Sequence, residues 1–184
     1  MDCPVCKIPL NSSDHLEPQL IAKVCKQCSG HWVNSYQYWK WRDYQKEPLP
    51  RIPPNEEDEI IVKDSNKAKL CPECGHFLRS SRVGHGLNFA LDRCANCGGF
   101  WFDKNEWAAL RQAGLHLDTH SIFTKVWQRE VKQNAIREDF DRIYSERFGR
   151  DDYSKIKRIR NWIQNHPKKD FILRYIFDED PYSI

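Results

Sequence analysis

Hydrophobic and polar residues alternate in the middle of the chain, where Leu87, Phe89 and Leu91 are separated by polar or small neighbours. Such alternation is typical of a half-buried strand, and glycines mark the turn between two strands. The pattern predicts a hairpin with strands Phe77–Val83 and Leu87–Arg93. An upstream segment is less regular because prolines interrupt it, and its returning strand is expected at Gln19–Val24.

After Leu115 the spacing of hydrophobic positions changes to three or four residues, which predicts amphipathic helices. A first helix is expected to end at Gly149, a second to begin at Asp151 and Asp152, and a third to carry Pro167 in its first turn. Three such helices predict a small bundle or a helical cap on the rest of the protein. The hydrophobic positions of the first helical segment are Ile122, Phe123, Val126, Trp127, Val131, Ile136, Phe140, Ile143, Tyr144 and Phe148.

Two similar segments precede these helices, and each carries two Cys-x-x-Cys knuckles. Four thiolates at this spacing suit a tetrahedral zinc ion, so the sequence predicts two zinc ribbons with two zinc ions per chain. A rubredoxin-type iron site uses the same four sulfurs, but the long hairpin and the helix after it favour structural zinc. The predicted ligands are Cys3, Cys6, Cys25 and Cys28 in the first ribbon and Cys71, Cys74, Cys94 and Cys97 in the second.

The two segments remain similar beyond their cysteines, because Trp32 aligns with Trp101 and Asn34 with Asp103. Asn or Asp is a good helix N-cap, and Gln or Glu three residues later completes a capping box. Helices are therefore expected at Ser35–Gln45 and Lys104–Ala113, the second stopped by Gly114, with each tryptophan packing its helix on its knuckle.

The composition of the chain indicates its cellular compartment and limits the kinds of partner to expect. All 8 cysteines belong to the two sets, so none is left for a catalytic thiol, and a net charge of +3 does not by itself imply a polyanion partner. A disulfide framework is the alternative use of the cysteines, but the chain begins with no basic and apolar leader. No run of about 18 apolar residues is present either. We therefore expect a protein of the reducing cytoplasm with no membrane partner.

These observations predict an α+β fold of two zinc ribbons, each a β-hairpin plus a short helix, followed by an α-helical C-terminal region. The expected domains are ribbon 1 (1–45), a Pro-rich and acidic linker (46–69), ribbon 2 (70–114) and a three-helix region (115–184). A short strand at Ile60-Ile61-Val62 is expected to join the second ribbon.

The second segment resembles the bacterial transcription factor IIB-type zinc-ribbon family. The resemblance rests on its CPxC knuckle, on the run from Cys94 to Asp103 with its glycine pair and Trp101, and on Glu106 and Leu110 in the next helix. The first segment is similar to a diverged copy, with Ser29 in place of the first glycine and Asn34 in place of the aspartate. The resemblance covers about residues 1–113 and implies the fold and the metal, but little about activity.

No catalytic motif is found, and a closed four-cysteine shell leaves zinc no open position. We therefore expect no enzyme and no small-molecule substrate. His116 and His120 lie four residues apart, but nothing completes a metal site, and boundary polar residues are the better interpretation. In the first helix Tyr36, Trp39 and Tyr44 have no aromatic counterpart in the second, and burial is favoured over base stacking.

Two groups of basic residues are candidate nucleic-acid contacts. Arg79, Arg82 and His85 surround the glycine-flanked hairpin tip, which can reach phosphates. Four further basic residues follow the acidic start of the second C-terminal helix, where charge complementation is the favoured interpretation: Lys155, Lys157, Arg158 and Arg160.

The sequence thus predicts a non-enzymatic zinc-binding adaptor that binds nucleic acid or a nucleic-acid-handling assembly, with a role in transcription. The alternative is a structural protein–protein interaction module, and a weaker alternative is a thiol redox switch that releases zinc on oxidation. The identity of the partner, the choice among DNA, RNA and protein, the oligomeric state and the role of the C-terminal helices are left open.

Overall fold

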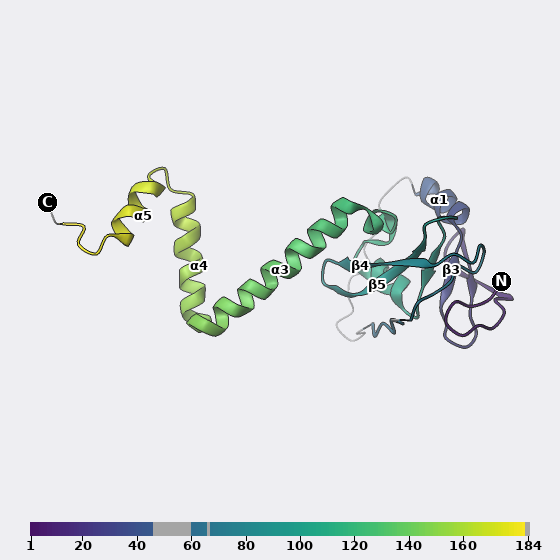
Figure 1. The fold of residues 1–184 in the computed structure, drawn as a ribbon. Helices are drawn as coiled ribbons and strands as arrows, with labels where there is room; N and C mark the ends of the chain where they lie inside the picture. Colours follow the sequence, from purple (N-terminus) through teal and green to yellow (C-terminus); the bar gives the residue numbers. More distant parts are fainter. Residues whose placement is uncertain (46–59, 66, 183–184) are drawn as a thin grey trace. The chain divides into compact units, whose positions relative to one another are not determined.

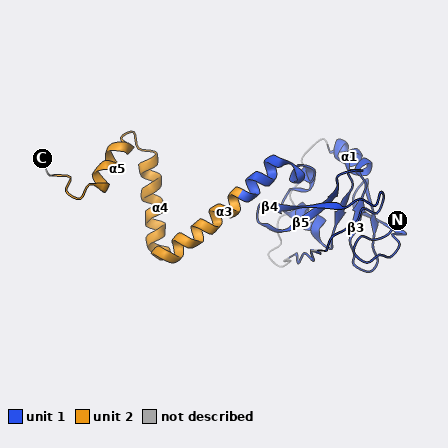
Figure 2. Ribbon diagram, in the orientation of Figure 1, with its two compact units in different colours: residues 1–132 blue, residues 133–184 orange. Residues whose placement is uncertain are grey.

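The computed structural model describes residues 1–45, 60–65 and 67–182, so the Pro-rich and acidic part of the expected linker lies outside the described residues. Two compact units are present, residues 1–132 and residues 133–184 (Figure 2). Unit 1 contains both cysteine sets, and the described secondary-structure elements of unit 2 are all helices. The α+β fold class is therefore confirmed, with a helical region at the C-terminus.

A six-stranded antiparallel sheet with the order β1-β2-β3-β6-β5-β4 forms the centre of unit 1 (Figure 1). Each ribbon contributes three consecutive strands, and β3 of the first ribbon pairs with β6 of the second. The two ribbons therefore share one sheet, which the pattern of the sequence does not predict. The strands are β1 (Ser12–Glu17), β2 (Leu20–Val24), β3 (His31–Val33), β4 (Leu78–Gly84), β5 (Leu87–Cys94) and β6 (Phe100–Phe102).

The predicted hairpin is confirmed as β4 and β5, and the predicted returning strand of ribbon 1 as β2, each within one residue of its expected bounds. At the hairpin turn Gly84, His85 and Gly86 all have positive φ. Glycine adopts this conformation without steric cost, which is why the two glycines mark the turn. The strand expected at residues 60–62 is absent from the described sheet. Lys63 instead forms an isolated bridge to Lys104.

Two tryptophans join the ribbons. Trp32 of β3 lies directly opposite Trp101 of β6. A Cβ added to Gly30 would lie 2.2 Å from the Trp101 ring, and a Cβ added to Gly99 would lie 2.3 Å from the Trp32 ring. Each indole thus packs against the glycine of the other ribbon, among the cysteines, rather than joining its own helix to its own knuckle as the sequence analysis expects.

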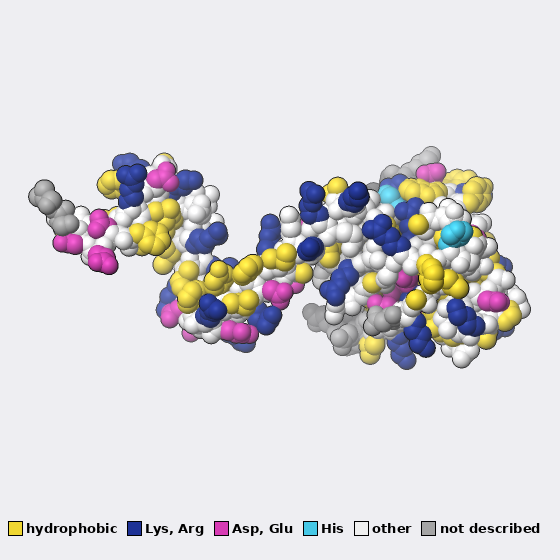
Figure 3. Space-filling model, in the orientation of Figure 1, with side chains coloured by type: hydrophobic (Ala, Val, Ile, Leu, Met, Phe, Trp, Pro, Cys, Tyr) yellow, Lys and Arg dark blue, Asp and Glu magenta, His cyan; other side chains and the backbone are white. Residues whose placement is uncertain are grey.

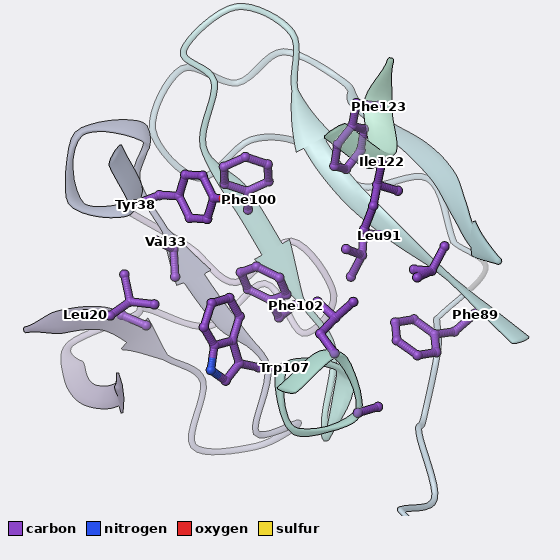
Figure 4. Packing of buried hydrophobic residues seen from close by; sticks show 14 of the residues in the cluster. Leu20, Val33, Tyr38, Phe89, Leu91, Phe100, Phe102, Trp107, Ile122 and Phe123 are labelled. Atoms are coloured by element: carbon purple, nitrogen blue, oxygen red, sulfur yellow. The ribbon is translucent and has the colours of Figure 1, made fainter. Parts of the chain in front are cut away.

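The sheet separates two hydrophobic cores. One face carries the cysteines together with both tryptophans and Leu10. The opposite face carries the larger core, in which Phe100 and Phe102 lie at the centre of the sheet beneath Tyr38 and Trp107 from the two ribbon helices (Figure 4). Because neighbouring side chains of a strand point to opposite faces, Trp101 enters the first core while Phe100 and Phe102 enter the second.

The two ribbon helices are α1 (Ser35–Tyr44) and α2 (Glu106–Gln112). Asn34 caps α1 as predicted, because its side chain accepts a hydrogen bond of 2.9 Å from the backbone N–H of Gln37. Gly114 ends α2 as predicted, with φ at 73°. The N-cap expected at Asp103 is wrong, because the helix begins after Asn105 and the Asp103 carboxylate has other partners.

After α2 the chain crosses the helical face of the sheet in two short 3₁₀ turns, His116–Asp118 and Ser121–Phe123, and enters α3 (Lys125–Phe148). The first turns of α3 pack on the β4–β5 hairpin. The Trp127 indole N–H donates to the carbonyl of Val83 at 2.8 Å, and the Gln128 amide donates to that of Arg82 at 2.8 Å. The beginning of α3 is therefore part of unit 1.

Unit 2 contains the rest of α3, followed by α4 (Arg150–Gln164) and α5 (Lys169–Phe177). Gly149 separates the first two helices, as predicted, but it is also the N-cap of α4. The helix begins at Arg150, so Asp151 and Asp152 lie within its first turn and do not cap it as expected. Pro167 lies two residues before α5, not within its first turn. Among the described residues of unit 2 only Ile163 is buried, so these helices do not form the expected bundle.

The described helices include none with both the length and the apolar composition needed to cross a bilayer.

The Trp–Gly packing predicts that Gly30→Ala destabilises unit 1 by about 1–3 kcal/mol, because a methyl group has no room beside the Trp101 ring. Thermal and denaturant unfolding measure the cost. In a Trp101→Leu background the same substitution should cost much less, since the ring that it meets is gone. An equal cost in both backgrounds would contradict the packing.

Candidate metal centres

All four cysteine knuckles have the same backbone geometry. The backbone N–H after the second cysteine donates to the carbonyl of the first cysteine, at 2.9 Å for Lys7, 2.8 Å for Ser29 and 3.0 Å for both Gly75 and Gly98. These four residues also share a positive φ. The resulting tight turn places both sulfurs of each knuckle on one side, as the spacing of the cysteines predicts.

Each set of four sulfurs converges on one point. Within a set the Sγ atoms all lie within 4.8 Å of one another, and the Cys3–Cys28, Cys71–Cys97 and Cys74–Cys94 pairs are 3.7, 3.5 and 3.4 Å apart. A zinc ion with Zn–S bonds of about 2.3 Å requires sulfurs roughly 3.8 Å apart. A disulfide requires about 2.05 Å, and all eight cysteines are free, so the disulfide interpretation is wrong.

The surroundings of the sulfurs suit a structural metal. The first cysteine of every knuckle is buried, while the second is partly exposed. The backbone N–H of Cys6 points to the sulfur of Cys3 at 3.3 Å and that of Cys97 to the sulfur of Cys94 at 3.5 Å. Such N–H groups stabilise thiolate charge. Burial raises the pKa of the Cys3 and Cys71 thiols to about 11, and a bound cation offsets this cost by holding them as thiolates.

The described fold and these sites define a tandem zinc-ribbon protein that holds two zinc ions per chain. Residues 2–43 and 70–113 each match the family described as transcription factor zinc-finger, so each ribbon is similar to that family. This confirms the resemblance inferred from the sequence, including its two copies. No curated protein and no solved structure matches the chain.

A buried group of charges lies behind the second ribbon. The Lys69 ammonium contacts Asp92 at 2.5 Å and Asp103 at 2.9 Å, and all three side chains are almost fully buried. Burial alone lowers the pKa of Lys69, but the two carboxylates more than reverse this, so the lysine stays charged. Asp103 also accepts from the Trp101 indole at 2.7 Å. This network explains why Asp103 does not cap α2.

Carboxyl oxygens of Asp64, Asp103 and Glu106 also lie within 4.8 Å of one another. Glu106 accepts from the Asp103 backbone N–H at 2.8 Å, which is half of the predicted capping box. Burial raises the pKa of Glu106 well above its ordinary value, with the charge of Asp103 adding to the effect. The Lys69 ammonium offsets the charge of Asp103 in this cluster, and we assign it no metal.

His116 and His120 pack among aromatic rings. His116 is buried beside Trp41 and Trp107, and neither ring nitrogen has a hydrogen-bond partner among the described residues. His120 lies 3.2 Å from the Tyr38 hydroxyl. Within the described residues neither belongs to a group that could hold a metal. Burial of His116 corrects the expectation of a boundary position, because the turn after Gly114 directs the chain back over the helices.

The three aromatic residues of α1 that have no aromatic counterpart in α2 differ in how far they are buried. Trp39 packs on His120 with ring centroids 4.9 Å apart and is partly buried, as favoured, although its partner lies between the two 3₁₀ turns and not on a C-terminal helix. Tyr36 and Tyr44 remain exposed, at 67% and 58%.

The hairpin residues proposed from the sequence do not form one cluster. Arg79 and Arg82 are both exposed, but they lie three positions apart on β4 and project from opposite faces of the strand. The His85 ring packs on Trp127, with ring centroids 4.6 Å apart. The sequence pattern located the hairpin, but the covering of its tip by α3 is a tertiary contact with no local signal.

The two sites predict two zinc ions per chain in protein purified without added metal, measured by elemental analysis against protein concentration. The physical reason is that each set of four thiolates is complete and converges on one point. One zinc ion per chain, or none with the thiols still reactive, would contradict both sites.

The ribbons should also lose zinc at different rates. Positive φ falls on Lys7 and Ser29 in ribbon 1 but on Gly75 and Gly98 in ribbon 2, and a non-glycine residue costs about 1 kcal/mol or more there. Ribbon 1 should therefore lose zinc first under a chelator, and Ser29→Gly should slow that loss several-fold. Cysteine labelling with site-resolved mass spectrometry follows both ribbons. Earlier labelling of Cys71 and Cys94 than of Cys3 and Cys25 would be the opposite result.

Proposed function

We propose that this protein is a non-enzymatic zinc adaptor that binds nucleic acid at the outer end of its sheet. The observation that carries the proposal is a pair of like charges. Arg79 of β4 lies directly opposite Arg93 of β5, on the edge strand and its neighbour. Like charges in this arrangement destabilise a sheet, so their presence favours an anionic ligand that compensates them.

The surroundings do not neutralise this pair. Within the described part of the chain no carboxylate lies within ion-pairing distance of Arg79 or Arg93. The Arg93 guanidinium lies 5.4 Å from the centre of the Phe100 ring and 5.9 Å from that of Phe123. These rings hold Arg93 in place without cancelling its charge. Phosphate oxygens accept charge-assisted hydrogen bonds from arginine side chains.

A third arginine extends the same surface. Arg42 of α1 lies 5.4 Å from the centre of the Trp39 ring and donates to the carbonyl of Leu117 at 3.1 Å. Burial lowers the pKa of His120, and the charges of Arg42 and Arg93 both add to this effect, so both arginines lie near that histidine. We name Arg42, Arg79 and Arg93 the arginine surface.

Catalysis is not part of the proposal, because four cysteines close each zinc site and leave no position for substrate or water. Zinc instead replaces the large core that a ribbon of about 40 residues cannot build alone. The metal therefore acts at a distance, by fixing the sheet that presents the arginines. A role in transcription is consistent with the family that the two ribbons match, and rests on that likeness alone.

A comparison of Arg79→Glu with Arg82→Glu tests the arginine surface. Both residues are exposed on β4 but project from opposite faces, so they form a matched pair. Arg79→Glu should weaken binding to single-stranded and duplex oligonucleotides and reduce the slope of log K against log salt by about 0.7–0.9. Arg82→Glu should have a much smaller effect. Zinc content should be unchanged in both variants, and Arg79→Glu should unfold at the same or a slightly higher temperature, because the new carboxylate faces Arg93.

Three other outcomes have distinct meanings. Equal losses in the two variants would move the contact to the hairpin as a whole, as the sequence alone suggested. Unchanged affinity in both would remove the hairpin from the interface. If the unmutated protein binds no oligonucleotide even at low salt, nucleic-acid binding is wrong. The exposed Tyr36 and Tyr44 of α1 would then favour the protein–protein interaction module.

A further inference from the structure

The helices of unit 2 carry more exposed hydrophobic surface than they cover. In α5 Phe171 is 73% exposed and Phe177 is 81% exposed, and Ile159 and Trp162 of α4 are each more than half exposed. Between α4 and α5 lies a shallow groove of about 230 Å³. Its lining is mostly aliphatic, and Figure 3 shows hydrophobic side chains on the surface of these helices with lysines and arginines beside them.

Apolar residues lie on more than one side of α5, and this limits the kind of partner that can cover them. Leu173, Ile176 and Phe177 line the groove beside α4. Phe171 and Tyr175 lie four residues apart on another side of the same helix and are also exposed. A helix that is apolar on several sides needs an apolar medium around it, whereas a single docking groove covers one stripe. Lipid acyl chains provide such a medium.

The positive charge of α4 and α5 indicates which lipid headgroups would attract them. Between Arg150 and Phe177 the chain has eight lysines and arginines against three aspartates. Lys155 and Lys157 form ion pairs with Asp152 and Asp141. The remaining basic residues after Arg150 have no carboxylate within ion-pairing distance in the described part of unit 2: Arg158, Arg160, Lys168, Lys169 and Arg174.

We propose that α4 and α5 form an interfacial hairpin that binds the surface of a bilayer with anionic headgroups. A helix with a strongly segregated apolar side, a polar side rich in lysine and arginine, and Trp or Phe at the boundary lies in the plane of the interface. In α4, Ile156, Ile159 and Ile163 recur at helical spacing, and Trp162 follows the basic run. The apolar side chains of α5 enter the outer part of the bilayer.

This proposal differs from the expectation of no membrane partner, which rested on the absence of a long apolar run. Binding at the interface needs no span, because a helix that lies in the plane of the bilayer surface enters only its outer part. The acidic residues Asp178, Glu179 and Asp180, which follow α5, oppose attraction to anionic lipid. Their negative charge should therefore weaken binding to anionic lipid. Neutral substitutions at these three positions should strengthen it.

Vesicle co-sedimentation of the full chain tests the proposal. Vesicles of phosphatidylcholine with about one third phosphatidylglycerol should bind the protein at least tenfold more tightly than phosphatidylcholine alone. Ile159→Asp and Phe177→Asp, both at exposed positions, should each reduce binding at least tenfold. Arg158→Glu with Arg160→Glu should reduce it by fivefold or more per residue, because each cation near an anionic surface contributes about a factor of five.

Two variants serve as matched controls. Phe140→Asp places the same charge on an exposed apolar position of α3, outside the hairpin, and should leave vesicle binding unchanged. Replacing Asp178, Glu179 and Asp180 with Asn, Gln and Asn should increase binding to the anionic vesicles. Circular dichroism and zinc content check that each variant folds.

Several vesicle-binding results would contradict the proposal. No binding to anionic vesicles at low salt overturns it, and so does equal binding to neutral and anionic vesicles. A loss with Phe140→Asp as large as that with Phe177→Asp also overturns it. If the hairpin variants change only the sedimentation coefficient of the protein and not vesicle binding, the apolar surface is covered by a second protein chain. Oligonucleotide affinity reports separately on the arginine surface.

Discussion

The exchange of tryptophans between the ribbons is the contact on which unit 1 depends. Trp32 fills the space beside Gly99, and Trp101 fills the equivalent space beside Gly30. Neither space accommodates a Cβ, so glycine is required at both positions. The contact aligns β3 with β6 and converts two small hairpins into one six-stranded sheet. Further contacts across the ribbons follow from this pairing, such as the ion pair of Glu17 with Arg111.

The two faces of the shared sheet have different roles. The cysteines and tryptophans occupy one face, where zinc stabilises short turns that have little core of their own. The opposite face packs the helices against Phe100 and Phe102 and leaves arginines at the edge of the sheet. The metal sites and the proposed nucleic-acid surface are thus connected through the strands, and the zinc ions need not touch the ligand.

Local signals in the sequence predicted much of this structure. The cysteine spacing gave both metal sites, Asn34 and Gly114 gave the ends of helices, and alternation gave the β4–β5 hairpin. Each of these depends on residues within a single ribbon, and most of them on residues a few positions apart. The position of Asp103 was misjudged because its carboxylate is used by Lys69, 34 residues away in sequence. His116 was misjudged for a similar reason, since its burial depends on both ribbon helices.

Pairing of the ribbons could not be predicted from the pattern, although its residues were visible. The alignment of Trp32 with Trp101 shows a repeat, but a repeat is equally compatible with two independent ribbons. Only the reciprocal fit of each ring on the other glycine distinguishes the two cases. In unit 2 the helical pattern predicted three helices correctly, but an amphipathic pattern does not say what covers the apolar side.

The central claim is that the two ribbons fold as one unit, and amide hydrogen exchange tests it most directly. In a Cys25→Ser, Cys28→Ser variant the first zinc site is lost while the second keeps all its ligands. If the ribbons are one unit, the backbone amides of β6 should lose at least tenfold of their protection, although β6 belongs to the intact ribbon. Wild-type protection of β6 in this variant, with one zinc ion still bound, would show that the ribbons fold independently and would contradict the account.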